Sequence, residues 1–253
     1  MKRLTELCPF FALLLGGVGL LLRRWQLATC FDAAGLPISG PATPVLAGFT
    51  AAVMVAALVC ARCFSGKPDW KSSFGARPMY LLVPPFLGAV AAGTLFVQNY
   101  QSEIRESSVV GYAAKALPLL MVLGCALLAV GCLLMARGGK SDPAIIMGPG
   151  FGCCFWMIHA YHAHASNPVV PRFAWFLMAI VCSAAAWYYV AGSAMNQNKP
   201  RRTLFCALTA VVLCLISLAG EEALCDQLLL LCHAVALTAV SLRLTHTGYE
   251  KTE

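Results

Sequence analysis

Charged residues are scarce in this chain: Asp, Glu, Lys and Arg together make up 11% of its 253 residues, whereas 60% are apolar. A soluble domain of ordinary composition has about a quarter charged residues, so this shortage excludes that class. Acidic residues are rarer than basic ones, with 11 Asp and Glu against 18 Lys and Arg. Together with a mean hydropathy of +0.75, the composition indicates an integral membrane protein.

The short motifs of several common enzyme classes are also missing. The chain contains no HExxH zinc motif, no nucleophile elbow around a serine and no phosphate-cradling glycine loop. Its basic segments are short and have no interleaved aromatic residues, so we expect no nucleic-acid partner. An N-x-S/T glycosylation acceptor is absent as well.

Eight apolar runs divide the chain, and each is long enough or nearly long enough to cross a bilayer. A hydrocarbon core of about 30 Å needs roughly 20 apolar residues in a helix, which pairs its own backbone polar groups. We therefore predict an all-α, polytopic integral membrane bundle of about eight transmembrane helices, forming a single domain over residues 1–253. The predicted spans are 8–22, 43–64, 79–97, 116–135, 144–162, 173–195, 203–219 and 223–244.

The distribution of Lys and Arg predicts the orientation of the chain, because short segments rich in these residues stay in the cytoplasm. With the N-terminus inside, thirteen lie in inner segments and five in outer ones. The thirteen are Lys2, Arg3, Arg62, Lys67, Lys71, Arg77, Arg137, Lys140, Lys199, Arg201, Arg202, Arg243 and Lys251. The five are Arg23, Arg24, Arg105, Lys115 and Arg172. This asymmetry predicts that both termini are cytoplasmic.

Helix-breaking residues interrupt two of the spans. Pro84 and Pro85 lie in the third span, and three glycines and a proline fall within residues 148–152 of the fifth. Such residues remove backbone hydrogen bonds or weaken a helix, so we predict a bend, a break or a late helix start at both places.

Small residues predict close helix contacts. Gly124 and Gly131 are seven residues apart and therefore share one helix face. Gly16, Gly17 and Gly19 form a second group in the first span. Small side chains let helix backbones approach one another in a membrane, so we interpret both groups as packing faces.

Two outer connections are long enough to have structure of their own. Residues 25–41 are predicted to form the longest irregular outer loop, with turn residues that favour a short hairpin. Residues 98–113 form a polar stretch that suits a surface helix.

Cysteine and aromatic residues within the spans are interpreted as structural. Most of the 13 cysteines lie in spans, where a thiol behaves as a small apolar side chain, and Cys153 and Cys154 are read in this way. Trp187, Tyr188 and Tyr189 are interpreted as an aromatic belt at the membrane interface.

The candidate functional residues are ionisable side chains in or beside the apolar layer. His159 and His162 are three residues apart and share a helix face at the outer end of the fifth span. Asp226 and His233 are seven residues apart on the last span, and His233 lies within the apolar layer. Ionisable groups there are costly and usually face a partner or a wet cavity. If these two spans are neighbours, the four residues line one outward-facing cavity that binds a proton or a ligand.

The alternative interpretation of these residues is structural. His159 and His162 would then contact lipid headgroups, and Asp226, close to the acidic pair 221–222, would cap the last helix. His233 would make one hydrogen bond between helices. The sequence assigns no cofactor and leaves metal binding by the histidine pair open.

Three functions fit these features. The first is a transporter or permease for small molecules or ions, which we prefer because ionisable groups lie in the apolar layer. The second is a non-catalytic anchor, assembly or sensory subunit that binds a partner protein or a quinone, and the third is a membrane-embedded lipid-modifying enzyme. The lipid bilayer is the expected partner, and a protein partner or a second copy is left open. The compact chain without a glycosylation acceptor favours a bacterial cytoplasmic membrane.

Overall fold

The computed structural model describes most of the chain as helix. The described residues are 2–32, 35–66, 74, 79–106, 112–138, 143–164, 169–195, 197–220 and 223–250. The acidic pair 221–222 and five of the predicted inner charges lie outside them. These five are Lys67, Lys71, Arg77, Lys140 and Lys251.

Eight of the helices in the described part of the chain are long and apolar enough to cross a membrane, which confirms the predicted polytopic helical bundle. The helices are α1 (Lys2–Thr29), α2 (Ala42–Cys63), α3 (Val83–Glu106), α4 (Tyr112–Arg137), α5 (Pro143–Ile146), α6 (Gly148–His164), α7 (Val170–Ala194), α8 (Pro200–Ser217) and α9 (Leu224–Glu250), with the short 3-10 helix η2 (Tyr80–Leu82) before α3. The fifth span, Pro143–Ala163, combines α5 with the 17-residue α6, and the third, Tyr80–Asn99, combines η2 with α3. These two short helices extend the starts of α6 and α3.

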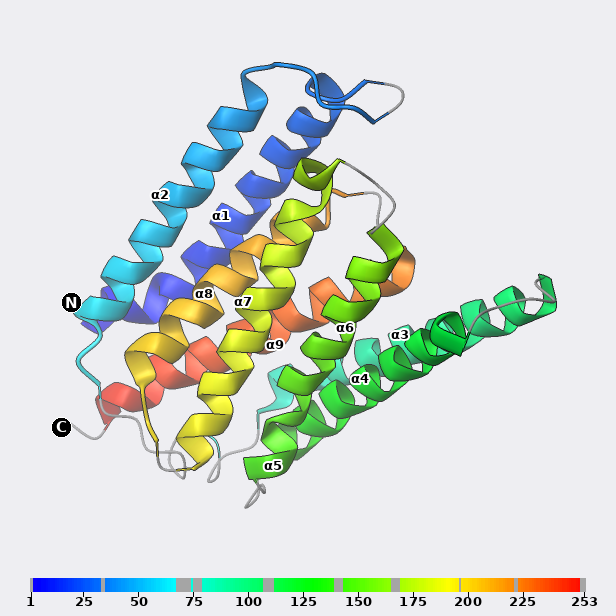
Figure 1. Ribbon diagram of the computed structural model, residues 1–253. Coiled ribbons are helices and arrows are strands. Elements are labelled where there is room, and N and C mark those ends of the chain that lie inside the picture. Colours follow the sequence, from blue (N-terminus) through cyan, green and yellow to red (C-terminus); the bar gives the residue numbers. More distant parts are fainter. Residues whose placement is uncertain are drawn as a thin grey trace.

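The centre of the bundle is formed by α8 and α9. About two thirds or more of the span residues in these two helices are buried, at 67% and 72%, against 28% in α2 and in the third span. Helices α1 and α2 both pack against α8 on one side of the bundle. Helix α3 packs against α9, and α4 packs against α3. Helix α7 lies against α8, and α6 connects α7 to α4. Figure 1 shows the α1–α2 and α3–α4 hairpins diverging from this centre.

Both ends of the chain lie at the same end of the bundle, as an even number of spans requires. Figure 1 shows the start of α1 and the end of α9 close together. We call this the inner end, because the distribution of basic residues predicts that it faces the cytoplasm. The opposite end is called the outer end.

The first helix is longer than predicted, and the first outer loop is correspondingly shorter. Helix α1 continues to Thr29 instead of ending near residue 22. The reason is that Arg23, which looks like a stop signal in the sequence, is buried and donates hydrogen bonds to the Gln26 side chain and to the backbone carbonyl of Arg172 at the start of α7. A buried arginine with such partners can remain inside a helix.

The rest of the first outer loop contains the predicted hairpin in a minimal form. Phe31 and Pro37 form an isolated antiparallel bridge, and the Ile38 N–H donates to the Cys30 carbonyl at 2.8 Å. Gly35 has a φ of +77°, which glycine adopts without strain.

The predicted surface helix in the second outer connection is instead the continuation of α3 to Glu106 and the start of α4 at Tyr112.

Both predicted interruptions are found at helix starts. Pro84 and Pro85 are the second and third residues of α3, and Pro149 is the second residue of α6. The first turn of a helix has no internal partner for its N–H groups, so proline is tolerated there. A turn at Met147 separates α5 from α6. These interruptions therefore lie near the inner end of the bundle, where the two spans begin.

Glycine contacts confirm the predicted packing face of α4. A Cβ added to Gly152 of α6 would lie 2.9 Å from the Gly124 carbonyl oxygen, and one added to Gly131 would lie 2.8 Å from the Pro149 ring. The backbones of α4 and α6 thus touch directly. In α1, Gly16 and Gly19 lie against the Leu215 and Ile216 side chains of α8. Gly17 has open space beside it and does not belong to this packing face.

Candidate functional site

The last span has a buried histidine near its middle. His233 is the tenth residue of α9, about 14 Å along the helix from Leu224, and only 3% of its surface is exposed. The imidazole is held from two other helices, α6 and α7. It is the centre of a group that we call the His233 cluster, which consists of His233, Trp187, Cys153, Trp156 and Asp226.

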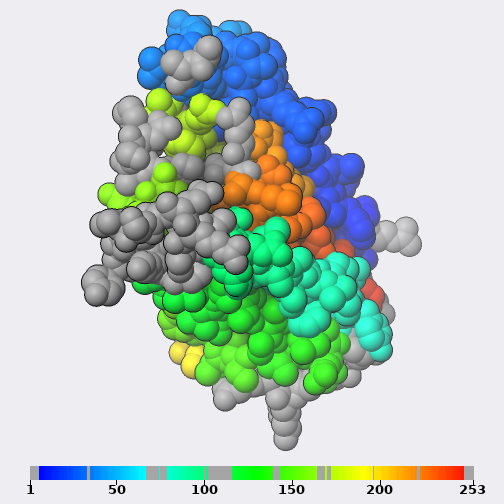
Figure 2. All heavy atoms as spheres, turned by 90° about the vertical axis from the view of Figure 1, so that its right-hand side faces the viewer, coloured from blue at the N-terminus to red at the C-terminus, as the bar shows by residue number. Residues whose placement is uncertain are grey.

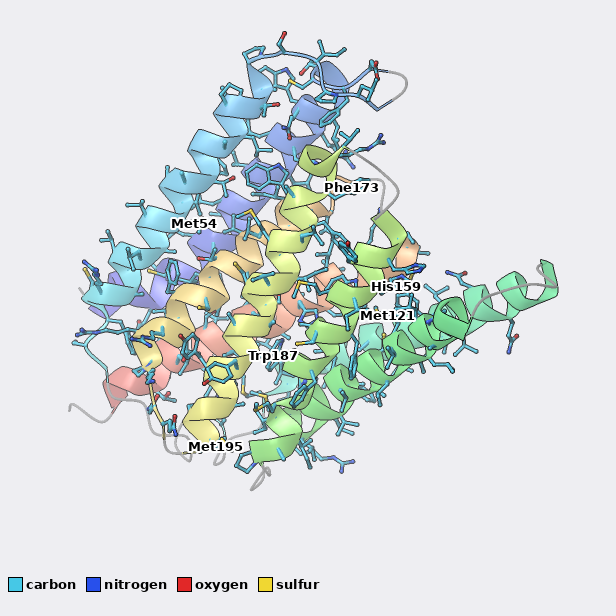
Figure 3. All side chains as sticks on the ribbon, in the orientation of Figure 1. Met54, Met121, His159, Phe173, Trp187 and Met195 are labelled. Atoms are coloured by element: carbon cyan, nitrogen blue, oxygen red, sulfur yellow. The ribbon has the colours of Figure 1, made fainter. Side chains whose placement is uncertain are left out.

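The strongest restraint on the imidazole comes from α7. The indole Nε1–H of Trp187 donates to His233 Nδ1 at 3.1 Å, and the Trp187 side chain is fully buried. On the other side of the ring, Nε2 lies 3.7 Å from the Cys153 sulfur of α6. Figure 3 labels Trp187 on α7.

These two contacts determine the protonation state of His233. An indole N–H is only a donor, so Nδ1 must present a lone pair. The neutral imidazole therefore has its proton on Nε2, which donates to the Cys153 sulfur. An imidazolium would carry a proton on Nδ1 as well, and this proton would face the Trp187 N–H. Protonation of His233 is thus incompatible with the Trp187 hydrogen bond.

Trp156 of α6 connects His233 to the outer end of the last span. Its indole ring stacks on the His233 ring with centroids 5.6 Å apart and an angle of 17° between the planes. Its Nε1–H donates to Asp226 Oδ1 at 2.7 Å. Asp226 is 7% exposed and lies in the first turn of α9, where the helix dipole favours a negative charge. One tryptophan therefore contacts both candidate residues of α9, Asp226 and His233.

The packing of the bundle explains how α6 reaches α9. Helix α6 lies beside α4 and α7, and the large Trp156 side chain extends from it toward α9. Phe176 of α7 supports that ring edge to face, with centroids 5.5 Å apart. The fifth and last spans are therefore in contact, as predicted, but the contact is made by the Trp156 side chain and not by closely packed backbones.

Trp156 links two of the four predicted residues, Asp226 and His233, which do not contact each other, and the other two lie elsewhere. His159 is half-buried, and its ring packs edge to face on Phe96 of α3 at 5.6 Å. His162 is exposed at the outer end of α6. Figure 3 labels His159 on α6, on the side of the α3–α4 hairpin. The spacing of residues in the sequence predicts which of them share a helix face. It does not predict which other helix that face contacts.

Sequence reasoning missed the aromatic half of the cluster. Trp187 was interpreted as part of an interfacial belt, but it is completely buried; its neighbour Tyr188, at 59% exposure, has the predicted outward position. Cys153 is buried as expected of a packing residue and also contacts His233. Trp156 carried one available signal: it is a tryptophan within the same span as the histidine pair, away from the span ends.

Among the described residues, no three His, Cys, Asp or Glu side chains come close enough together to form a metal site. The His233 cluster has one imidazole, one thiol and one carboxylate; the thiol contacts the imidazole directly, and Trp156 lies between the imidazole and the carboxylate. Comparison with known proteins adds no relative, because no protein-family model, curated protein or solved structure matches the chain.

Proposed function

We propose that this multi-pass membrane protein is a proton-linked transporter of small molecules or ions in a bacterial cytoplasmic membrane, with both termini inside. The observation that supports this most directly is the hydrogen bond from Trp187 to Nδ1 of a buried histidine. It makes the contact between α7 and α9 dependent on one proton. Ionisable residues inside membrane spans mark proton relays and substrate pathways in pumps and transporters.

Protonation of His233 would change the bundle in a defined way. The new Nδ1–H would face the Trp187 N–H, so the hydrogen bond between α7 and α9 would be lost. The Trp156 ring face remains favourable for the imidazolium, because an aromatic face attracts a cation. Asp226, about 10 Å away along α9, supplies a negative charge toward the outer end. The proton therefore shifts α9 from contact with α7 toward contact with α6.

The other two functions have less support in the geometry. A quinone-binding anchor would need His233 to be reachable from the lipid, and the ring is covered by Trp156, Trp187 and Cys153. A lipid-modifying enzyme would need His159, His162 and Asp226 to converge near one interface. Asp226 is instead bonded to Trp156, and His162 is exposed.

Proteoliposomes test the proposal. Vesicles that contain the pH dye pyranine are placed in acidic buffer, and a panel of amino acids, sugars and inorganic cations is added singly. We expect proton entry that depends on one class of solute in the wild type and is abolished in His233→Gln. The matched control is His162→Gln, an exposed histidine at the outer end of α6, which should transport normally.

A second measurement does not require the substrate. Protonation of His233 should quench the stacked Trp156, so the tryptophan fluorescence of the purified protein should show an acid transition that His233→Gln lacks. If the wild type and His233→Gln have the same fluorescence profile over the whole acid range, the proton site is not at His233 and the proposal is wrong.

A further inference from the structure

A pocket of about 680 Å³ opens at the inner end of the bundle, far along α9 from His233. Its walls come from three elements: the start of α1, the 3-10 helix η2 and the last turns of α9. Figure 2 shows the dark blue start of α1, the turquoise region where α3 begins and the red end of α9 along one edge of the molecule. The volume is within the range of ordinary ligand sites, about 300–1,000 Å³.

The polar residues of this pocket carry both signs of charge. Arg243 and His246 are three residues apart on α9, and the pocket includes both side chains. Glu6 lines it from α1. An arginine is suited to a phosphate group, and a carboxylate to an ammonium group. A ligand that matches the pocket should therefore carry a phosphate and a cation in the same headgroup.

The apolar residues of the pocket continue into the surface that faces lipid. Phe10 and Leu7 of α1 are 51% and 48% exposed, and Leu81 of η2 is 59% exposed. An exposed apolar rim marks a surface that binds another apolar group. A soluble metabolite has no such group to cover this rim, whereas an acyl chain does. The rim therefore indicates a ligand with a hydrocarbon tail.

We propose that this pocket binds phosphatidylethanolamine of the inner leaflet. The phosphate lies against Arg243 and His246, the ammonium group donates to the Glu6 carboxylate, and the acyl chains follow Phe10 and Leu81. The site joins the first and last helices of the chain through one lipid molecule. This inference is independent of the proposed transport, because it uses none of the residues of the His233 cluster.

Native mass spectrometry of the delipidated full-length protein tests the site. The probes are phosphatidylethanolamine, phosphatidylglycerol, which lacks the ammonium group, and phosphatidylcholine, whose quaternary nitrogen has no N–H donor. We expect the wild type to bind the first about tenfold more tightly than the other two, a difference of about 1.4 kcal/mol, because only its ammonium group donates to the Glu6 carboxylate. Glu6→Gln should abolish this preference, while Arg243→Gln should weaken all three lipids about tenfold.

Two controls separate the site from general effects. Arg202→Gln removes an exposed arginine of α8 near the inner end and should leave all three affinities unchanged. Arg243→Lys keeps the charge and should retain most of the binding, so it remains informative if Arg243→Gln fails to fold. Equal binding of the three lipids by the wild type, or an unchanged preference in Glu6→Gln, would overturn the proposal.

Discussion

The contact between Trp187 and His233 can be tested by a double-mutant cycle. Trp187→Phe removes the indole N–H and leaves His233 Nδ1 buried without its donor. His233→Leu removes the acceptor and leaves the Trp187 N–H buried without its partner. The double variant removes both groups at once, so neither is left unpaired. The contact lies between α7 and α9, two helices joined by few other backbone approaches.

The magnitude follows from the burial of both side chains, which are 0% and 3% exposed. Leaving one buried polar group unsatisfied costs about 1–3 kcal/mol, whereas replacing both partners by apolar groups is nearly neutral. Hydrogen bonds between membrane helices have measured couplings of about 0.6 kcal/mol on average and about 1.7 at most. We expect each single variant to lose about 1–3 kcal/mol and the coupling energy to be about 1 kcal/mol.

Steric trapping in bicelles measures the unfolding free energies at equilibrium. The control cycle pairs His233→Leu with Tyr188→Phe, since Tyr188 is exposed next to Trp187, and these two effects should add within about 0.3 kcal/mol. Equally additive effects for Trp187→Phe and His233→Leu would show that the two rings are not coupled. The assignment of the proton to Nε2 of His233 would then be wrong as well.

Two further predictions each compare two residues of one type by thermal unfolding, which is followed with a thiol-reactive dye that labels buried cysteines as they become exposed. Gly152→Ala should destabilise the protein by about 1–3 kcal/mol, because its Cβ meets the Gly124 carbonyl at 2.9 Å, while Gly17→Ala should cost nothing because the space beside Gly17 is open. Arg23→Gln should lower the stability by about 1.5–3 kcal/mol, because it removes the charged donor that joins α1 to α7, and the exposed Arg24→Gln should have little effect. Equal losses within either pair would contradict the structure.

Side-chain environments explain why the candidate site was only half predictable. His233 could be identified because an ionisable residue in an apolar run stands out in any composition profile. Trp187 could not, because a tryptophan near the end of a span is equally compatible with an interfacial position and with a buried one. Its donor role depends on the rotation of α7 about its own axis, and that rotation is decided by packing against α8.

The amino-acid sequence alone determined the class of this protein, the number of its membrane spans and the predicted direction in which each crosses. The reason is that solvation by hydrocarbon acts on each segment separately: about 20 apolar residues must form a helix whatever their neighbours are. Only the tertiary structure decided that α8 and α9 are central, that Arg23 lies buried between α1 and α7, and that two tryptophans enclose His233. These features depend on contacts between helices, which come from the shapes of small and large side chains along whole faces rather than from any local pattern.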